Sequence, residues 1–389
     1  MKLDIQLEDI RRAAGNCLRC DMCTYSEWPD CYTICPVYNY DRCFSYSGGG
    51  YMYLARNLVD KKLTLDKRVI EFLYTCPGCL ACDEICKIIP VSEPYVRPFD
   101  IIRLMRHEAV KQGLISKEEL KVLREPSIRY EAGMSSKDSN VYGIPETIYD
   151  KDADKVLFVE SSFLNSHQGI YQSLLRIFEK IGDPISAVSD DGLNLPELYD
   201  LGFWEEVEAY LSSRFDVKGL SGRELIFLNP HSQEFISKRC PEIIPEFEDI
   251  ETRHVSEIIL NALKGNRLQS KKESMVVKIS YHDPCYLGRG LNIYDPPRDA
   301  LSLIDGVELI EMQRNRKSSF CCGARARDNY FRGFSKTTAI ERLNEFKRTD
   351  ADLLITACPH CKDIFQEMMH EKERDLVQDL TMFIEERIV

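Results

Sequence analysis

Two different patterns of hydrophobic and polar residues divide the chain near residue 155. Beyond that point, short apolar runs of strand length alternate with longer stretches in which apolar residues recur every three or four positions. The apolar runs are 156–160, 225–229, 275–281, 307–312 and 352–357, and the stretches with helical spacing are 169–182, 254–265 and 337–348. Strands that alternate with helices predict an α/β fold with mostly parallel sheets. Because the pattern recurs, we expect two similar halves, residues 151–270 and 271–389.

The beginning of the chain has helical spacing without such runs. Its amphipathic stretches are 51–62, 65–75 and 98–113. Residues 126–150 carry many proline, glycine, serine and charged residues, a composition that favours a linker. The expected fold class is therefore α plus α/β: a helical domain over residues 1–125, a linker, and two α/β halves with parallel sheets.

Composition narrows the possible functions. The 389 residues carry a net charge of −12 with no basic stripe, which argues against nucleic acid as the main ligand. No apolar run approaches the ~18 residues that would span a bilayer. The first 16 residues lack the apolar core of a secretory signal. We therefore expect a cytoplasmic protein that reaches a membrane only through a partner.

Cysteine is the residue that stands out, with 16 in the chain. Disulfide frameworks are typical of short secreted chains, whereas these cysteines form tight groups in a long one. Residues 76–86 read CPGCLACDEIC, and residues 17–23 read CLRCDMC, with a fourth partner displaced to Cys35. Three closely spaced cysteines and a distant fourth are the pattern that binds a cubane 4Fe–4S cluster. In two-cluster ferredoxins the fourth cysteine serves the other cluster.

This crossing predicts two sets of cubane ligands. They are Cys17, Cys20, Cys23 and Cys86 for one cluster, and Cys76, Cys79, Cys82 and Cys35 for the other. Structural zinc is the alternative, but zinc sites usually separate two Cys-x2-Cys pairs and fit three successive cysteines poorly. Lys87 stands where a proline usually follows, and Cys31 is an alternative ligand to Cys35. We expect Cys43 to be a spare buried thiol.

Five more cysteines recur with a regular spacing around the sequence FCCG. They are Cys285, Cys321, Cys322, Cys358 and Cys361, in the pattern Cys-x35-Cys-Cys-x35-Cys-x2-Cys. Each lies at the end of an expected strand or in the loop after it, and the carboxyl ends of parallel strands meet at one edge of a sheet. Five thiolates there exceed what a zinc ion or a cubane needs. Buried cysteines without a shared role would not converge in this way.

At these residues the chain resembles the cysteine-rich CCG domain of heterodisulfide reductase. The resemblance is carried by YHDPCYLGRGLNIYDPPRDAL, MQRNRKSSFCCGA and ITACPHCKDIF, and with the two-cluster front end it covers nearly the whole chain. The layout is similar to the D-type member of that enzyme, in which an electron-relay part is fused to the catalytic part. The resemblance implies a noncubane 4Fe–4S cluster held by the five cysteines. Cys321 and Cys322 would then reach different irons.

The first α/β half departs from the family's pattern. Where a first copy of the double cysteine is expected, the chain has Asp190 and Asp191, and where Cys-x2-Cys is expected it has Asn229 and Ser232. Carboxylates match iron–sulfur iron poorly compared with thiolates. We therefore expect this half to keep its fold and to hold no cluster.

Two further departures lie beside the cluster cysteines. Tyr286 replaces a usual histidine, and ARAR at residues 324–327 replaces a usual glycine-rich turn. These changes bear on the substrate more than on the cluster. His282 and His360 flank cluster cysteines and could donate protons to a nascent thiolate near neutral pH. A hydrogen-bonding histidine that only supports the ligands is the alternative.

Other charged and glycine-rich segments suggest weaker hypotheses. Arg289, Arg325 and Arg327 could hold an anionic substrate bidentately, although surface solvation is the commoner fate of such arginines. The Ser-Gly-Gly-Gly run at 47–50 lacks the lysine of a phosphate-binding loop, and we expect a hinge there. No dinucleotide-binding glycine fingerprint is present, so a flavin or nicotinamide would belong to a partner.

The sequence therefore predicts an iron–sulfur redox subunit of the heterodisulfide reductase D type. Two cubanes would relay single electrons from a redox partner, which could be a flavoprotein, an iron–sulfur protein or a membrane cytochrome. The noncubane cluster would then reduce a disulfide or related sulfur substrate. The alternative is an electron-transfer adaptor without a substrate site, as in the iron–sulfur subunits of glycolate, lactate or glycerol-3-phosphate dehydrogenases. Loss of the first CCG site favours this alternative somewhat.

Overall fold

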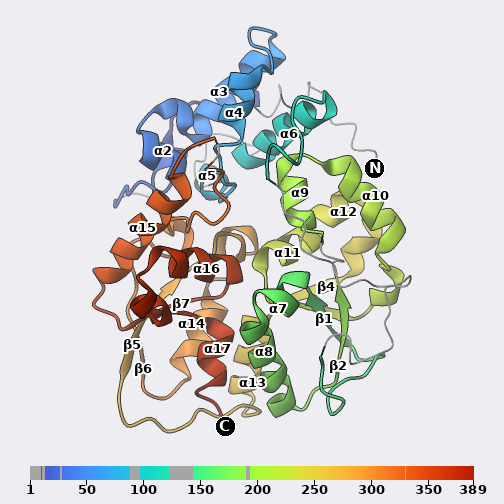
Figure 1. Ribbon diagram of the computed structural model, residues 1–389, viewed down its shortest axis with the longest axis vertical. Helices are drawn as coiled ribbons and strands as arrows, with labels where there is room; N and C mark the ends of the chain where they lie inside the picture. Colours follow the sequence, from blue (N-terminus) through green and yellow to red (C-terminus); the bar gives the residue numbers. More distant parts are fainter. Residues whose placement is uncertain are drawn as a thin grey trace.

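Three parts of the chain can be followed in Figure 1. Cysteine-bearing helices lie at the top, a green-to-yellow α/β half lies below them on the right, and an orange-to-red α/β half lies on the left. The computed structural model describes residue 10 and residues 14–26, 29–87, 97–121, 143–189, 193–328 and 330–389. The expected fold class, a helical part followed by two α/β halves with parallel sheets, is confirmed. None of the described helices combines the length and apolar character that crossing a bilayer requires.

Short helices packed around cysteines build the N-terminal part. Helix α3 buries Tyr51, Met52 and Ala55 on one face, and α6 starts at Pro98, whose missing N–H costs nothing in the first helical turn. The described helices are α2 (Pro36–Asp41), α3 (Gly48–Val59), α4 (Lys67–Leu73), α5 (Ala81–Cys86) and α6 (Pro98–Lys111), with the 3₁₀ turns η1 (Met22–Thr24) and η2 (Phe44–Tyr46).

The first α/β half contains a parallel sheet of four described strands in the order β2-β1-β3-β4. The strands are β1 (Lys155–Val159), β2 (Ile185–Ser189), β3 (Glu224–Phe227) and β4 (Glu251–His254). The helices are α7 (Ser161–Asn165), α8 (Gln168–Ile181), α9 (Leu195–Leu201), α10 (Trp204–Arg214), α11 (Pro230–Glu234), α12 (Cys240–Ile243) and α13 (Val255–Lys264), with the turns η4 (Lys218–Leu220), η5 (Phe235–Arg239) and η6 (Pro245–Asp249).

The second half repeats this topology, with the strand order β6-β5-β7-β8. The strands are β5 (Val277–His282), β6 (Val307–Leu309), β7 (Leu353–Thr356) and β8 (Val377–Asp379). The helices are α14 (Asp295–Ser302), α15 (Phe334–Lys347), α16 (Pro359–Met368) and α17 (Leu380–Glu385), with the π-helix η7 (Tyr286–Gly290) and the 3₁₀ helices η8 (Arg316–Ser318) and η9 (Glu371–Leu376). One hydrophobic core contains residues from both sheets, such as Leu157 and Ile355, so the two halves are packed together.

Three strands were missed by the hydrophobic pattern, and all three lie at sheet edges. They are β2, which reads ISAVS, β4, which reads ETRH, and β8, which reads VQD. An edge strand has one neighbour and one open side, so it can be short and polar. The five runs that the sequence did predict include all four central strands, because helices cover both faces of a parallel sheet and its central strands are therefore apolar along their length.

The end of the expected linker packs on the first half. Tyr149 forms an isolated parallel bridge with Ile185, and Ile144 and Ile148 are buried. Residues 122–142, which include most of the expected linker, lie outside the described residues. The domain boundaries read from the sequence stay predictions.

A buried carboxylate joins the three parts. Asp200 in α9 accepts hydrogen bonds of 2.6 Å from Arg103 Nε in α6 and of 2.6 Å from the Tyr286 hydroxyl in the second half. His231 Nε2 lies 3.1 Å from the same carboxylate, and Arg325 donates to it as well. Burial alone would raise the pKa of Asp200, but the guanidinium groups of Arg103 and Arg325 hold it well below its usual range. The group is therefore ionised and binds cations from two other parts of the chain.

We expect Asp200→Asn to lower the free energy of unfolding by about 3 kcal/mol, because removing one member of a buried ion pair leaves the remaining charges uncompensated. Urea unfolding of the purified protein measures this change. Asp249→Asn makes the same substitution at an exposed position and should change the free energy by less than about 0.5 kcal/mol. Similar small changes in both variants would show that Asp200 does not join the parts.

Candidate functional site

Two groups of N-terminal cysteines surround two separate cavities. Cys17, Cys20, Cys23 and Cys86 line the first cysteine cavity. Cys35, Cys76, Cys79 and Cys82 line the second cysteine cavity. The structure thus brings together the same groups that the ferredoxin-like crossing predicts. Which atoms bind iron stays a prediction.

The two N-terminal cysteines outside these groups lie elsewhere. Cys31 is half-buried and is not among the residues that line the second cysteine cavity, whereas Cys35 is buried there. The expectation that Cys43 is a buried thiol is wrong, because Cys43 is exposed at the start of η2. The geometry therefore favours Cys35 over Cys31 as the fourth ligand of the second cavity.

Gly48 lies between the first and second cysteine cavities. An added Cβ at this residue would lie 2.7 Å from Cys82 Cβ and 3.0 Å from Cys23 Sγ. The glycine run is therefore not the hinge expected from the sequence. It forms the first turn of α3, where Ser47 caps the helix by accepting a hydrogen bond from the Gly50 N–H. The small residues let the two cysteine groups approach each other closely.

The five remaining predicted ligands surround a third cavity, which we call the CCG cavity. Cys285, Cys321, Cys322, Cys358 and Cys361 all line it. Cys285 follows β5 and Cys358 follows β7, so neighbouring parallel strands deliver them to one edge of the sheet, as predicted. Gly323 closes the double cysteine with φ of 86°, a conformation that favours glycine, and its N–H lies 3.3 Å from Cys321 Sγ.

The second cysteine cavity adjoins the CCG cavity. Pro77 lines both, and Cys79 and Cys321 belong to one buried cluster with Cys285. The hydrogen bond between the thiols of Cys79 and Cys321, followed by burial, raises the pKa of Cys79 well above its usual value. Gly48 makes the corresponding link between the first and second cavities. The three cavities therefore form one continuous line from the N-terminal part into the second half.

The chemistry of the donors fits iron–sulfur clusters. Burial is the main cause that raises the pKa of Cys23, Cys35 and Cys285, and it raises the pKa of Cys76 to about 11 against the effect of Arg106. Several thiolates in so small an apolar space would be unstable alone, whereas a metal core with a positive charge stabilises the deprotonated form. The second cysteine cavity and the CCG cavity have no carboxylate in their lining and Asp21 lines the first, so sulfur, the donor that iron–sulfur clusters use, predominates in all three.

Both candidate histidines lie close to cluster cysteines, but of the two only His360 lines the CCG cavity. Burial, and then Arg342, lowers the pKa of His282, whose Nδ1 accepts a 3.1 Å hydrogen bond from Arg342 Nε. A ring nitrogen of His282 lies within 4.8 Å of the thiols of Cys322 and Cys361. Burial, followed by the neighbouring His167, lowers the pKa of His360 to about 4. Their roles as proton donors stay predictions.

The three candidate arginines have different surroundings. Arg289 is buried and donates from Nε to the Cys79 carbonyl at 2.9 Å and from Nη1 to the Ser319 carbonyl at 2.7 Å. It therefore ties the backbone of the second cysteine cavity to the second half, and surface solvation is wrong for this residue because it is buried. A role in substrate binding stays a prediction. Arg325 and Arg327 instead line a larger cavity.

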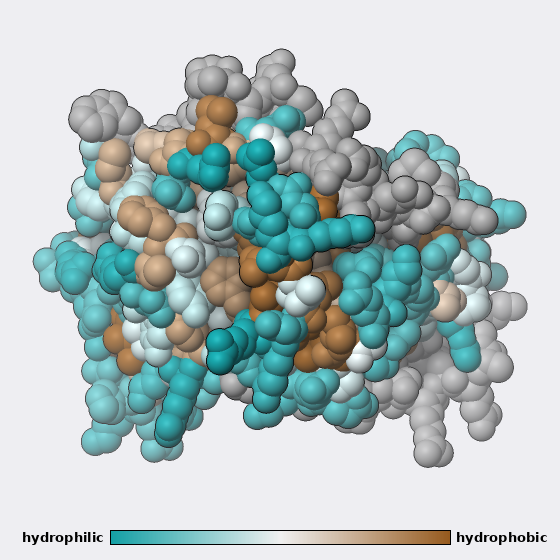
Figure 2. All heavy atoms as spheres, turned by 90° about the horizontal axis from the view of Figure 1, so that it is seen from above, coloured by the Kyte–Doolittle hydropathy of each residue, from teal (hydrophilic) through white to brown (hydrophobic). Residues whose placement is uncertain are grey.

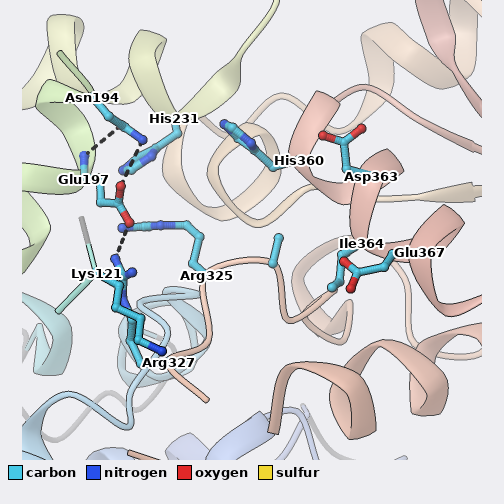
Figure 3. A pocket seen from close by; sticks show the side chains of 11 residues that line it. Lys121, Asn194, Glu197, His231, Arg325, Arg327, His360, Asp363, Ile364 and Glu367 are labelled. Atoms are coloured by element: carbon cyan, nitrogen blue, oxygen red, sulfur yellow. Dashed lines mark hydrogen bonds and ion pairs between the residues drawn. The ribbon is translucent and has the colours of Figure 1, made fainter. Parts of the chain in front are cut away.

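This larger cavity, which we call the open cavity, has a volume of about 330 Å³. Figure 3 shows its lining residues on two opposite walls, with Glu197, Arg325 and Arg327 on one side and Asp363 and Glu367 on the other. It opens toward the CCG cavity, since four residues line both. These are His231, Ala324, Arg325 and His360.

The place of the first CCG motif is filled by hydrogen bonds between polar side chains. Asn229 Nδ2 donates to Glu160 Oε2 at 3.0 Å, and the Ser232 hydroxyl donates to Glu160 Oε1 at 2.5 Å. Asn229 Nδ2 also lies 3.3 Å from His360 Nε2 in the second half. Residues 190–192, where the double cysteine is expected, lie outside the described residues. The described part of this half therefore offers oxygen and nitrogen donors that already bind one another.

Sequence reasoning missed Asp200 and His231 as residues of the site. Neither stands in a motif, and both reach it through tertiary packing of α9 and α11. The sequence did give one indication of this region, because Tyr286 and Arg325 both depart from the pattern of the family. The structure brings them together: Arg325 donates to the Tyr286 hydroxyl, and both bind Asp200.

Comparison with known proteins agrees with the geometry. Residues 279–366 match the family described as the cysteine-rich domain, CCG, and this range holds all five cysteines of the CCG cavity. The second half therefore contains a region similar to the CCG cysteine-rich domain. The expected relation to the D-like proteins of heterodisulfide reductase is also confirmed. The N-terminal cysteine cavities lie outside the matched range.

Three relatives illustrate the range of similar proteins. The chain is 31% identical over 146 residues to the D subunit of dihydromethanophenazine:CoB–CoM heterodisulfide reductase of Methanosarcina acetivorans, covering 37% of this chain and 36% of that one. It is 27% identical over 326 residues to the probable iron–sulfur-binding oxidoreductase FadF of Bacillus subtilis, covering 78% and 44%. It is 22% identical over 330 residues to EtfAB:quinone oxidoreductase of Syntrophomonas wolfei, covering 78% and 44%. The chain spans less than half the length of each of these three.

Replacing Cys35 tests whether each N-terminal group of three cysteines takes its fourth ligand from beside the other group. We expect Cys35→Ser to perturb the cluster held by Cys76, Cys79 and Cys82, because Cys35 lines their cavity. Electron paramagnetic resonance of the dithionite-reduced protein separates the signals of the two N-terminal clusters. Cys31→Ser is the matched control and should leave both signals intact. A normal spectrum from Cys35→Ser, with a damaged one from Cys31→Ser, would reassign the ligand.

Proposed function

We propose that this protein is an iron–sulfur oxidoreductase of the heterodisulfide reductase D type. Two 4Fe–4S cubanes in the N-terminal cavities and a noncubane 4Fe–4S cluster in the CCG cavity would form one electron path. The observation that carries the proposal is the continuous line of three cysteine-lined cavities, linked at Gly48 and Pro77. Homologues named as iron–sulfur oxidoreductases and heterodisulfide reductase subunits support it.

The proposed reaction is the reduction of a disulfide or related sulfur compound. One disulfide takes up two electrons and two protons, its S–S bond breaks, and two thiols leave. A reduced one-electron partner supplies the electrons, and solvent supplies the protons. When bound, an iron–sulfur cluster passes electrons one at a time.

The residues of this chain would shape the CCG cavity for that task. Pro230 and Pro284 line it together with the cysteines, so its walls away from the open cavity are mostly apolar. Arg289 holds the backbone of Cys79 against the second half and so fixes the approach between the two cavities. A polar approach leads in from the open cavity, past Arg325 and His360.

An electron-transfer adaptor is the second candidate. One observation favours it: Glu160, Asn229 and Ser232 satisfy one another by hydrogen bonds where a first CCG site would lie. A substrate held between two CCG clusters could not assemble in that arrangement. Two relatives are named as a quinone oxidoreductase and as the oxidoreductase FadF, and neither name mentions a heterodisulfide. These names favour the electron-transfer adaptor.

Either function needs a redox partner, and the N-terminal part offers a surface for one. Cys20 is exposed there, and large apolar side chains nearby in the sequence are exposed as well. They include Leu18 at 55%, Met22 at 40% and Phe44 at 50%. Figure 2 looks onto this end of the molecule and shows hydrophobic atoms gathered near the middle of a largely hydrophilic face. We place the docking of a flavoprotein, iron–sulfur protein or membrane cytochrome on this end.

A paramagnetic signal that depends on an added sulfur compound separates the reductase from the electron-transfer adaptor. We expect oxidation of the anaerobically purified protein in the presence of a thiol to give a paramagnetic signal whose shape depends on that thiol. Cys321→Ser should abolish this signal and leave both N-terminal clusters reducible, because Cys321 lies in the CCG cavity. Cys240→Ser, at a buried thiol outside all three cavities, is the matched control. If the signal of the CCG cluster is the same with every thiol and disulfide offered, the electron-transfer adaptor is the candidate that remains.

A further inference from the structure

The open cavity carries opposite charges on its two walls. One wall holds Lys121, Arg325 and Arg327, and the opposite wall, on α16, holds Asp363 and Glu367 (Figure 3). The formal charges sum to near zero once Glu197 is included, but they are separated in space. A cavity of this kind distinguishes ligands by the position of their charges more than by their net charge.

Most of the positive charge on the basic wall is already balanced. Arg325 pairs with the buried Asp200, and Arg327 pairs with Glu197. Arg327 Nη1 also donates to the Leu120 carbonyl at 3.2 Å, which holds the backbone next to Lys121 against this wall. The positive charge that remains for a ligand on this side is therefore that of Lys121. The N–H donors of Arg325 and Arg327 lie on the same wall.

The opposite wall keeps a negative charge. Asp363 and Glu367 lie four residues apart in α16, so their side chains project from the same face of the helix. Asp363 Oδ2 lies 2.5 Å from His167 Nε2, which engages that carboxylate. Glu367 is exposed at the rim and supplies the main negative charge for a ligand on this side.

The two walls flank the entrance to the cysteines. Ala324 and His360 line both the open cavity and the CCG cavity, so a molecule lying between the walls has its middle at this entrance. The volume of about 330 Å³ suits a molecule of the size of an amino-acid disulfide. A sulfur atom at the centre of such a molecule would face the cysteines while its ends meet the two charged walls.

We propose that the open cavity binds a small zwitterionic disulfide, or the matching thiol, with a carboxylate toward Lys121 and an ammonium group toward Glu367. This proposal rests on the proposed reductase function and adds its substrate class. A dianionic disulfide would place one carboxylate against Asp363 and Glu367, and a dicationic one would place an ammonium group against Lys121. Each of these ligands meets a like charge at one wall, whereas each end of an amino-acid disulfide carries both charges and can turn the opposite one toward the wall.

Binding of three matched disulfides tests the substrate class. Cystine, cystamine and 3,3′-dithiodipropionate share the same two-carbon arms and differ in carrying both charges, only ammonium groups or only carboxylates. Isothermal titration calorimetry on the oxidised, cluster-loaded protein without an electron donor measures binding alone. We expect cystine to bind about tenfold more tightly than either of the others, equivalent to about 1.4 kcal/mol.

Charge reversal on each wall should shift the preference in opposite directions. Lys121→Glu should weaken binding of dithiodipropionate and strengthen that of cystamine. Glu367→Lys should weaken binding of cystamine and strengthen that of dithiodipropionate. Lys218→Glu and Glu248→Lys make the same charge changes at exposed positions that do not line the open cavity, and they should leave the order unchanged.

The outcomes keep this proposal separate from the reductase function. Equal affinities for the three disulfides, or tighter binding of the dianion or the dication, would overturn the substrate class. The sulfur-dependent signal of the CCG cluster would still support the reductase in that case. If no disulfide binds and the signal is also indifferent to sulfur compounds, both proposals are wrong. Opposite shifts in the two wall variants, with unchanged controls, are the expected result.

Discussion

The arrangement of the three cysteine cavities depends on one buried ion, Asp200. The carboxylate belongs to the first α/β half, but the guanidinium groups that it binds belong to the N-terminal part and to the second half. An ionised carboxylate in the protein interior is stable only while such partners surround it. The same contact that satisfies Asp200 therefore fixes Arg103 of α6 and Arg325 of the double-cysteine loop relative to each other. In this way Asp200 supports both the proposed electron path and the open cavity.

This role gives the first half a function that does not require a cluster. Its Glu160, Asn229 and Ser232 form a hydrogen-bonded group where a first CCG site would lie. The first half contributes Asp200 to the ion pairs that connect the three parts. It also contributes His231 to both the open and CCG cavities, and Glu197 to the basic wall of the open cavity. The departures Tyr286 and Arg325 in the second half meet Asp200 as well. The polar group at the place of the first motif and these two departures thus lie in one connected region.

The sequence predicted the central strands, the long helices and the grouping of the cysteines, because burial and ligand spacing are local properties of the chain. It missed the edge strands β2, β4 and β8, whose short or polar sequences carry little signal. The glycine run at residues 47–50 was read as a hinge, since nothing in its own sequence reveals that Cys23 and Cys82 lie beside Gly48. Asp200 and Arg289 were missed or misread for the same reason, because their partners lie far away along the chain.

The iron content of the anaerobically purified protein tests the central claim most directly. Three cysteine cavities that each hold a four-iron cluster require about twelve irons per chain, with an equal amount of acid-labile sulfide. A value near eight would remove the cluster from the CCG cavity and, with it, the proposed electron path into the second half. A value near sixteen would show that the first half holds a cluster despite its Glu160, Asn229 and Ser232 group.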